Sequence, residues 1–232
     1  MKNGTLARFG GLCSILLGIV AILISVVYLL LPPEQRLGVK AAVILPSVAR
    51  GANLLLAQFW LLALEGVLGL VVVIALSRLV DPLAEGWVRF TALLAIVGFA
   101  ITAVGNVITI ARLPGVAAAY VAGDAATKAA LAPVWRSTLD PYGIFGYGAV
   151  GLWILVISAL ALRSSRLPHP LTYVGFAYGV LLLLIPVALL TGATTTLLIV
   201  VVVLSAIAGP IWWIWLGLQL LDQPAPSVRA SN

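Results

Sequence analysis

The sequence predicts an all-α polytopic membrane protein, a bundle of about six transmembrane helices with short interfacial helices in the connections, and three observations predict it. Of the 232 residues, 63% are hydrophobic and 9% are charged, whereas soluble domains carry about 25% charged residues. The hydrophobic residues form continuous runs, unlike the alternating pattern of membrane barrel strands. Six runs reach the roughly 20 residues that a helix needs to cross a hydrocarbon core about 30 Å thick.

The chain, residues 1–232, is expected to form a single transmembrane domain with a flexible C-terminal tail at 222–232. In lipid, each span has to satisfy its own backbone hydrogen bonds, as a helix does. Prolines and charged residues end three of the runs, namely Pro32 with Pro33, Arg112 with Pro114, and Asp222 with Pro224. The predicted spans cover residues 9–31, 53–76, 90–111, 142–162, 171–192 and 195–221.

Two connections are long enough to contain structure of their own. Residues 32–52 include the apolar stretch 39–45, which is too short to cross a bilayer and either lies at its interface or extends the second span outward. Residues 112–141 include an alanine-rich segment, in which Asp124 is suited to cap a short helix that Pro133 ends. Trp135 beside Arg136 favours an interfacial position for this segment.

The distribution of basic residues favours cytoplasmic termini. With six spans both termini lie on one side, and that side carries Lys2, Arg8, Arg78, Arg89, Arg163, Arg166 and Arg229. The opposite side carries Arg36, Lys40, Arg50, Arg112, Lys128 and Arg136. The two sets are nearly equal, but the first lies in shorter segments and the turn at 193–194 is uncharged, so the positive-inside rule places the termini in the cytoplasm.

The composition excludes several kinds of site. Cys13 is the single cysteine and His169 the single histidine, so one chain cannot form a disulfide, a zinc site with the usual ligands, or a haem held by two histidines. The net charge of +6 comes from basic residues scattered between apolar runs, which is typical of membrane-flanking charges and not of nucleic-acid binding. We therefore expect no cofactor and no nucleic-acid partner.

Glu65 is the one charged residue inside the six predicted spans. A charge at that depth costs about 2.5–3.5 kcal/mol on insertion scales, so we expect a neutral acid that faces other helices. Gln58 lies on the same helical face, and Thr102 with Asn106 forms a polar face on the third span. In an antiparallel hairpin of these two spans, Glu65 would be level with Thr102, and Gln58 with Asn106.

Two interpretations of these four residues remain open. They form an interhelical hydrogen-bond patch, in which each bond contributes about 0.6–2 kcal/mol, or they line a path for a proton or solute on which Glu65 is the protonatable group. The patch is the more ordinary arrangement, because transporters often use more than one ionisable group within the membrane.

Tryptophans gather near the end of the sixth span, after Pro210. Trp212 and Trp215 would share one helical face and Trp213 would point elsewhere. A belt at the level of the cytoplasmic headgroups is the favoured interpretation of these residues. An aromatic box for a cation or a planar ligand is the alternative.

Several short segments resemble one family of bacterial multi-pass membrane proteins, catalogued only as a domain of unknown function. They are Arg-Phe-Gly-Gly-Leu at 8–12, Ala-Ala-Tyr at 118–120, Gly-Leu-Trp at 151–153, Arg-Leu-Pro at 166–168 and Gly-Pro-Ile-Trp at 209–212 followed by Gly217. The resemblance covers most of the chain. It implies a multi-pass fold in the bacterial cytoplasmic membrane, and it implies no activity, cofactor or catalytic residue.

Three functions are compatible with these features. The first is a non-enzymatic binding, sensory or accessory membrane subunit that packs against a membrane protein partner or a second copy of itself, or holds a small apolar ligand. The second is a small transporter or channel with a protonatable Glu65. The third is an intramembrane enzyme, which would need a second reactive group near Glu65, and the sequence offers none. We expect the first.

Overall fold

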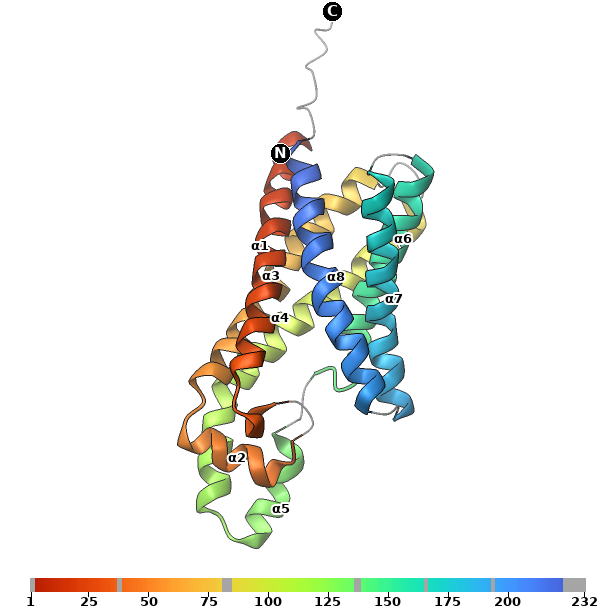
Figure 1. The fold of residues 1–232 in the computed structure, drawn as a ribbon. Helices are drawn as coiled ribbons and strands as arrows, with labels where there is room; N and C mark the ends of the chain where they lie inside the picture. The colour runs from red at the N-terminus through yellow and green to blue at the C-terminus, as the bar shows by residue number, and fades with distance from the viewer. Residues whose placement is uncertain are drawn as a thin grey trace, which may run out of the picture.

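A computed structural model of the chain confirms the all-α architecture (Figure 1). It describes residues 3–36, 39–80, 85–135, 139–164, 167–192 and 195–222. Every regular element within these ranges is a helix. Six segments are long and apolar enough to cross a membrane, which identifies a multi-pass membrane protein.

The helices follow one another in the predicted order. The spanning helices are α1 (Asn3–Leu30), α3 (Asn53–Val80), α4 (Glu85–Ala122), α6 (Val150–Ser164), α7 (His169–Thr191) and α8 (Thr195–Leu221), and the π-helical turn η3 (Ile144–Ala149) leads into α6. The long connections contain η1 (Pro33–Gln35), α2 (Ala41–Arg50) and α5 (Ala125–Val134). The turn at 193–194 and the predicted tail beyond Asp222 lie outside the described residues.

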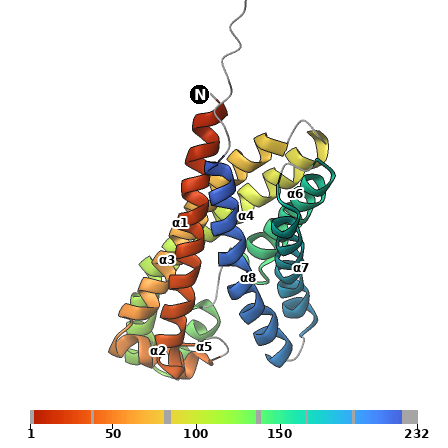
Figure 2. The same ribbon diagram turned by 45° about the horizontal axis from the view of Figure 1, so that its top comes forward.

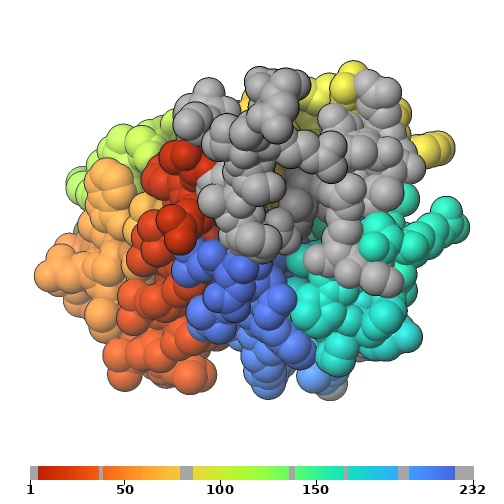
Figure 3. All heavy atoms as spheres, turned by 90° about the horizontal axis from the view of Figure 1, so that it is seen from above, coloured from red at the N-terminus to blue at the C-terminus, as the bar shows by residue number. Residues whose placement is uncertain are grey.

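The spans form two groups that meet along α1 and α8 (Figures 1 and 2). In the first group α3 packs against both α1 and α4, and in the second α7 packs against both α6 and α8. The start of α1 and the end of α8 lie at one end of the bundle, opposite α2 and α5 (Figure 1). Seen from that end, α1 and α8 lie side by side in the middle of the molecule (Figure 3).

Glycines bring the helix backbones together both between the two groups and within the first. A Cβ atom on Gly217 of α8 would lie 2.6 Å from the Gly11 carbonyl oxygen of α1. A Cβ atom on Gly66 of α3 would lie 2.6 Å from the backbone nitrogen of Ala103 in α4. Because lipid tails are as apolar as the side chains, helices in a bilayer associate through such close van der Waals contact.

The third span does not end at Arg112 and Pro114, as the sequence predicts, but continues as α4 to Ala122. The reason is tertiary packing. Beyond Arg112, the buried side chains of Leu113, Ala117 and Tyr120 belong to a second hydrophobic core, which α2 completes. We call this part of the molecule the outer lobe: η1, α2, α5 and the part of α4 that follows Arg112. Burial in this core holds α4 helical despite the proline.

Both short helices of the outer lobe have identifiable boundaries. The apolar stretch 39–45 leads into a separate helix, α2, and does not extend the second span. The chain leaves α2 at Gly51. The carbonyl oxygen of Gly51 accepts a hydrogen bond of 2.8 Å from Gln35 Nε2. Asp124 caps α5 as predicted, and its carboxylate accepts a 2.8 Å hydrogen bond from the backbone nitrogen of Thr127. That bond lowers the pKa of Asp124, so the cap is lost only as the pH falls through this lowered value.

The glycine contact between α3 and α4 gives a test of the fold. Gly66→Ala should lower the free energy of unfolding by about 1–3 kcal/mol, because the added methyl group meets backbone atoms that cannot move aside. Gly105→Ala in α4 is the matched control, since nothing lies within 4 Å of its new Cβ, and alanine favours a helix by up to about 1 kcal/mol. Thermal unfolding in detergent measures both. Equal melting temperatures for the two variants would contradict the close approach of α3 and α4.

Candidate functional site

Glu65 lies near the middle of α3 and is half-buried. It is the one acidic residue in the six spans, all of which the structure describes. Among the described residues, no hydrogen bond or ion pair to its carboxyl group is found. A carboxyl group in hydrocarbon is costly without such partners, so its surroundings decide what it can do.

Two tyrosine side chains of the second group of helices lie within electrostatic range of Glu65. The carboxyl group interacts electrostatically with Tyr178 of α7 and with Tyr147 of η3. Tyr178 is buried, and its hydroxyl oxygen accepts a hydrogen bond of 3.4 Å from Trp213 Nε1. The Tyr147 side chain is 44% exposed. Phenolic hydroxyl groups both donate and accept hydrogen bonds, but among the described residues no hydrogen bond joins Glu65 to either tyrosine.

The other residues of the predicted polar patch bond within α4. Thr102 Oγ1 donates to the Gly98 carbonyl oxygen at 3.0 Å, and Asn106 Nδ2 donates to the Thr102 carbonyl oxygen at 2.7 Å. Gln58 is half-buried on α3. Since Gly66 packs against Ala103, Glu65 and Thr102 lie at nearly the same depth, but within the described residues no hydrogen bond joins α3 to Thr102 or Asn106.

Asp140 organises the start of the span that contains Tyr147. Its carboxylate accepts three hydrogen bonds of 2.8 Å, from the backbone nitrogens of Ile144, Phe145 and Gly146. These are orphan donors of the first turn, which a carboxylate is suited to satisfy. Tyr147 interacts electrostatically with Asp140 as well as with Glu65. Tyr147 is therefore within electrostatic range of both Asp140, which precedes η3, and Glu65.

Sequence reasoning missed Tyr147, Tyr178 and Asp140 as neighbours of Glu65. The available signal is Asp140 followed by a glycine-rich stretch that contains Tyr142 and Tyr147. In the structure this stretch is η3, and π-helical turns occur frequently at functional sites. Tyr178 had no sequence signal, because it comes from a span distant in the chain.

The tryptophans of α8 do not form a headgroup belt. Trp212 and Trp213 are each 1% exposed, and their ring centroids lie 4.5 Å apart. Trp215 is half-buried and packs against the edge of the same core. The predicted belt is therefore wrong for Trp212 and Trp213, because both rings point into the bundle, where neighbouring aromatic and aliphatic side chains pack against them.

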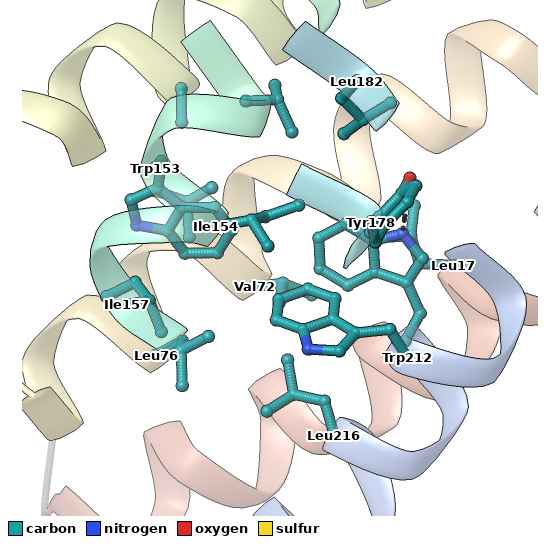
Figure 4. Close-up of a cluster of buried hydrophobic side chains, with 14 of the residues drawn as sticks. Leu17, Val72, Leu76, Trp153, Ile154, Ile157, Tyr178, Leu182, Trp212 and Leu216 are labelled. Atoms are coloured by element: carbon teal, nitrogen blue, oxygen red, sulfur yellow. Dashed lines mark hydrogen bonds between the residues drawn. The ribbon is translucent and has the colours of Figure 1, made fainter. Parts of the chain in front are cut away.

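Trp153 of α6 completes this aromatic cluster, which we define as Trp153, Tyr178, Trp212 and Trp213 (Figure 4). Trp153 is fully buried, and its Nε1 donates a 3.0 Å hydrogen bond to Ser77 Oγ of α3. On the other side, Ser14 Oγ of α1 donates to the Trp213 carbonyl oxygen at 2.6 Å. The cluster thus joins five spans and fixes the position of the Tyr178 hydroxyl group.

The arrangement around Glu65 can bind a proton or a small group that carries hydrogen-bond donors or positive charge. A carboxylate with nearby phenols offers acceptors, and the tyrosine rings offer negatively polarised faces to a cation. Among the described residues, no group of three or more His, Cys, Asp or Glu side chains could hold a metal ion.

The aromatic cluster is expected to be the most sensitive part of the core. Trp153→Ala should lower the free energy of unfolding by about 3–5 kcal/mol, because it leaves a cavity and removes the bond to Ser77. Trp60→Ala in α3 is the control, since that side chain is 57% exposed on the outer surface of the bundle. Denaturation in detergent measures both. A loss of stability for Trp60→Ala as large as that for Trp153→Ala would contradict the assignment of the core.

Comparison with known proteins adds one finding. No curated protein and no solved structure matches the chain. A family model described as "Domain of unknown function (DUF4386)" matches residues 4–221, from the first helix to the last. The match confirms the resemblance predicted from the sequence motifs. It covers all six spans together with Glu65, both tyrosines and the outer lobe, and the chain therefore belongs to the DUF4386 family.

Proposed function

We propose that this protein is a non-enzymatic membrane protein of the bacterial cytoplasmic membrane, with both termini in the cytoplasm, that binds a small cationic ligand at Glu65. The observation that carries the proposal is the half-buried carboxyl group in mid-span, faced by two tyrosines and without a hydrogen bond or ion pair among the described residues. The orientation rests on the distribution of basic residues.

The energetic argument favours a ligand over a purely structural role. A charged side chain at this depth costs about 2.5–3.5 kcal/mol, and a structural carboxyl group would offset that cost with hydrogen bonds from a neighbouring helix. Thr102 and Asn106 instead bond to carbonyl groups of their own helix. The α3–α4 contact has its own basis in Gly66 and Phe99. Within the described part of the chain, the oxygens of the Glu65 carboxyl group are thus free to accept hydrogen bonds from a ligand.

The ligand is inferred to be a small monovalent cation of the protonated-amine class. A carboxylate supplies the opposite charge, and Tyr147 and Tyr178 supply aromatic faces and hydroxyl groups. Binding of such a ligand suits a sensory or accessory subunit that passes its state to a membrane protein partner or to a second copy of the chain. The exposed apolar side chains of all six spans are suited to contact with surrounding lipid.

A second candidate function is a small transporter that uses Glu65 as its protonatable group. In its favour, Tyr147 lies within electrostatic range of both Asp140 and Glu65. Proton relays in membrane proteins use such chains. Here the relay would open at the side of the membrane where η3 begins.

Glu65→Gln and Glu65→Leu test the binding site. Ethylammonium chloride should raise the melting temperature of the wild-type protein in detergent, because a ligand that binds only the folded state stabilises it by mass action. Both variants should lose this rise and keep a melting temperature equal to or above that of the wild type, since the costly carboxyl group is gone.

Glu34→Gln, in the outer lobe, is the control and should keep the ethylammonium response. Sodium chloride at the same concentration corrects for ionic strength. The proposal fails if ethylammonium changes the melting temperature of neither the wild type nor Glu65→Gln. If, in addition, Glu65→Gln is as stable as the wild type and Glu65→Leu is strongly destabilised, Glu65 is a structural hydrogen-bond partner.

Proton flux into liposomes tests the transport candidate. With a pH-sensitive dye inside the vesicles, wild-type protein should acidify the interior faster than empty vesicles do. Glu65→Gln should abolish this excess, and Tyr147→Phe should slow it several-fold by removing the hydroxyl group between the two acids. Tyr142→Phe is the matched control, because Tyr142 is an exposed tyrosine just before η3. Wild-type flux equal to that of empty vesicles would reject transport and leave the binding proposal standing.

A further inference from the structure

A small pocket lies where α4 enters the outer lobe. Its volume is about 20 Å³, and α4 and the end of α5 form its walls. Its lining residues are Ile108, Thr109, Arg112, Leu113, Val116, Val134 and Trp135. A pocket of this size holds about one water-sized group. A larger molecule bound there would insert one small group into the pocket, and the rest of the molecule would lie outside the pocket.

The pocket is placed at the boundary of the hydrocarbon core. Arg89 and Arg112 flank the most apolar part of α4, and at a rise of about 1.5 Å per residue they are about 34 Å apart along the helix. A hydrocarbon core is about 30 Å thick, so the two arginines fit its two surfaces. The pocket therefore opens at the depth of lipid headgroups, and not into bulk solvent.

The charge at this boundary is positive. Arg112 is exposed, and among the described residues no ion pair to its guanidinium group is found. In residues 31–52 and 112–135, basic side chains outnumber acidic ones: Arg36, Lys40, Arg50, Arg112 and Lys128 against Glu34 and Asp124. A guanidinium group presents a fork of donors that matches two phosphate oxygens. The hydroxyl group of Thr109 lines the same pocket, although it also donates to the Gly105 carbonyl oxygen at 2.8 Å.

An apolar strip leads from the pocket towards the middle of the membrane. Val104, Val107 and Ile108 are exposed on one face of α4, at the spacing of neighbouring helical turns. A chain that begins at Arg112 and runs along this strip to Val104 would remain in contact with protein over about two turns of helix. The phosphate group and the acyl chain of a phospholipid have this geometry.

We propose that Arg112, which lines this pocket, forms a binding site for the phosphate group of an anionic phospholipid. One phosphate oxygen occupies the pocket, the guanidinium fork binds the others, and an acyl chain follows Val104 and Ile108. The site is separate from Glu65 and does not depend on the function proposed for that residue. Its ligand chemistry is opposite in charge, so the two sites take different molecules.

Lipid binding in detergent tests the proposal. Native mass spectrometry counts the phospholipids that remain bound to the full-length protein after titration with phosphatidylglycerol or phosphatidylcholine. We expect one phosphatidylglycerol to bind the wild type at least tenfold more tightly than phosphatidylcholine. Arg112→Gln should remove this preference, and Arg112→Lys should retain part of it, because lysine keeps the charge and loses the fork.

Arg50→Gln is the matched control, since Arg50 is an exposed cation of the same lobe outside the pocket. It should keep the full preference for phosphatidylglycerol. An equal loss in Arg50→Gln and Arg112→Gln would show a diffuse attraction to basic charge and overturn the site. Unchanged preference in Arg112→Gln would overturn it as well.

Inorganic phosphate separates a lipid headgroup from a free anion. The melting temperature of the wild type should rise with phosphatidylglycerol and stay constant with sodium phosphate at the same concentration. A rise of the same size with inorganic phosphate would overturn the assignment to lipid. Because Arg112 is exposed, each variant is expected to fold, and circular dichroism before titration verifies its helix content.

Discussion

A carboxyl group in the middle of a membrane span is the constraint on which the rest of this structure depends. Hydrocarbon offers no hydrogen bonds, so Glu65 has to face protein, and the helices around it have to supply polar groups. Those groups come from α7 and η3, although the nearest helix in the chain is α4. These polar groups lie near Glu65 only if the two groups of spans are held firmly against each other.

The aromatic cluster and the glycine contacts meet that requirement by different means. Gly66 and Gly217 allow helix backbones to approach within van der Waals distance, which is the main attraction available between helices in lipid. The buried tryptophans of α6 and α8 add a large contact area, and their indole groups bond to Ser77 and Tyr178. The same residues that stabilise the bundle thus fix one of the two hydroxyl groups near Glu65.

Outside the membrane, α4 serves a different purpose. Its last part provides one wall of the outer lobe, whose core is made of aliphatic residues and Tyr120. At the junction, Arg112 lines the pocket for which we propose a lipid headgroup. One helix therefore passes both proposed sites: Thr102 lies at the depth of Glu65, and Arg112 lines the pocket.

The sequence by itself determined the number, order and approximate limits of the spans, the cap at Asp124 and the isolation of Glu65, because run length, bilayer thickness and capping chemistry are local properties. Only the tertiary structure decided that α4 continues through Pro114, that Trp212 and Trp213 both point inward, and which side chains surround Glu65. In a bilayer, large apolar residues occupy lipid-facing and core-facing positions alike. Hydrophobic periodicity therefore leaves the rotation of each helix undetermined, and with it the identity of the neighbours of Glu65.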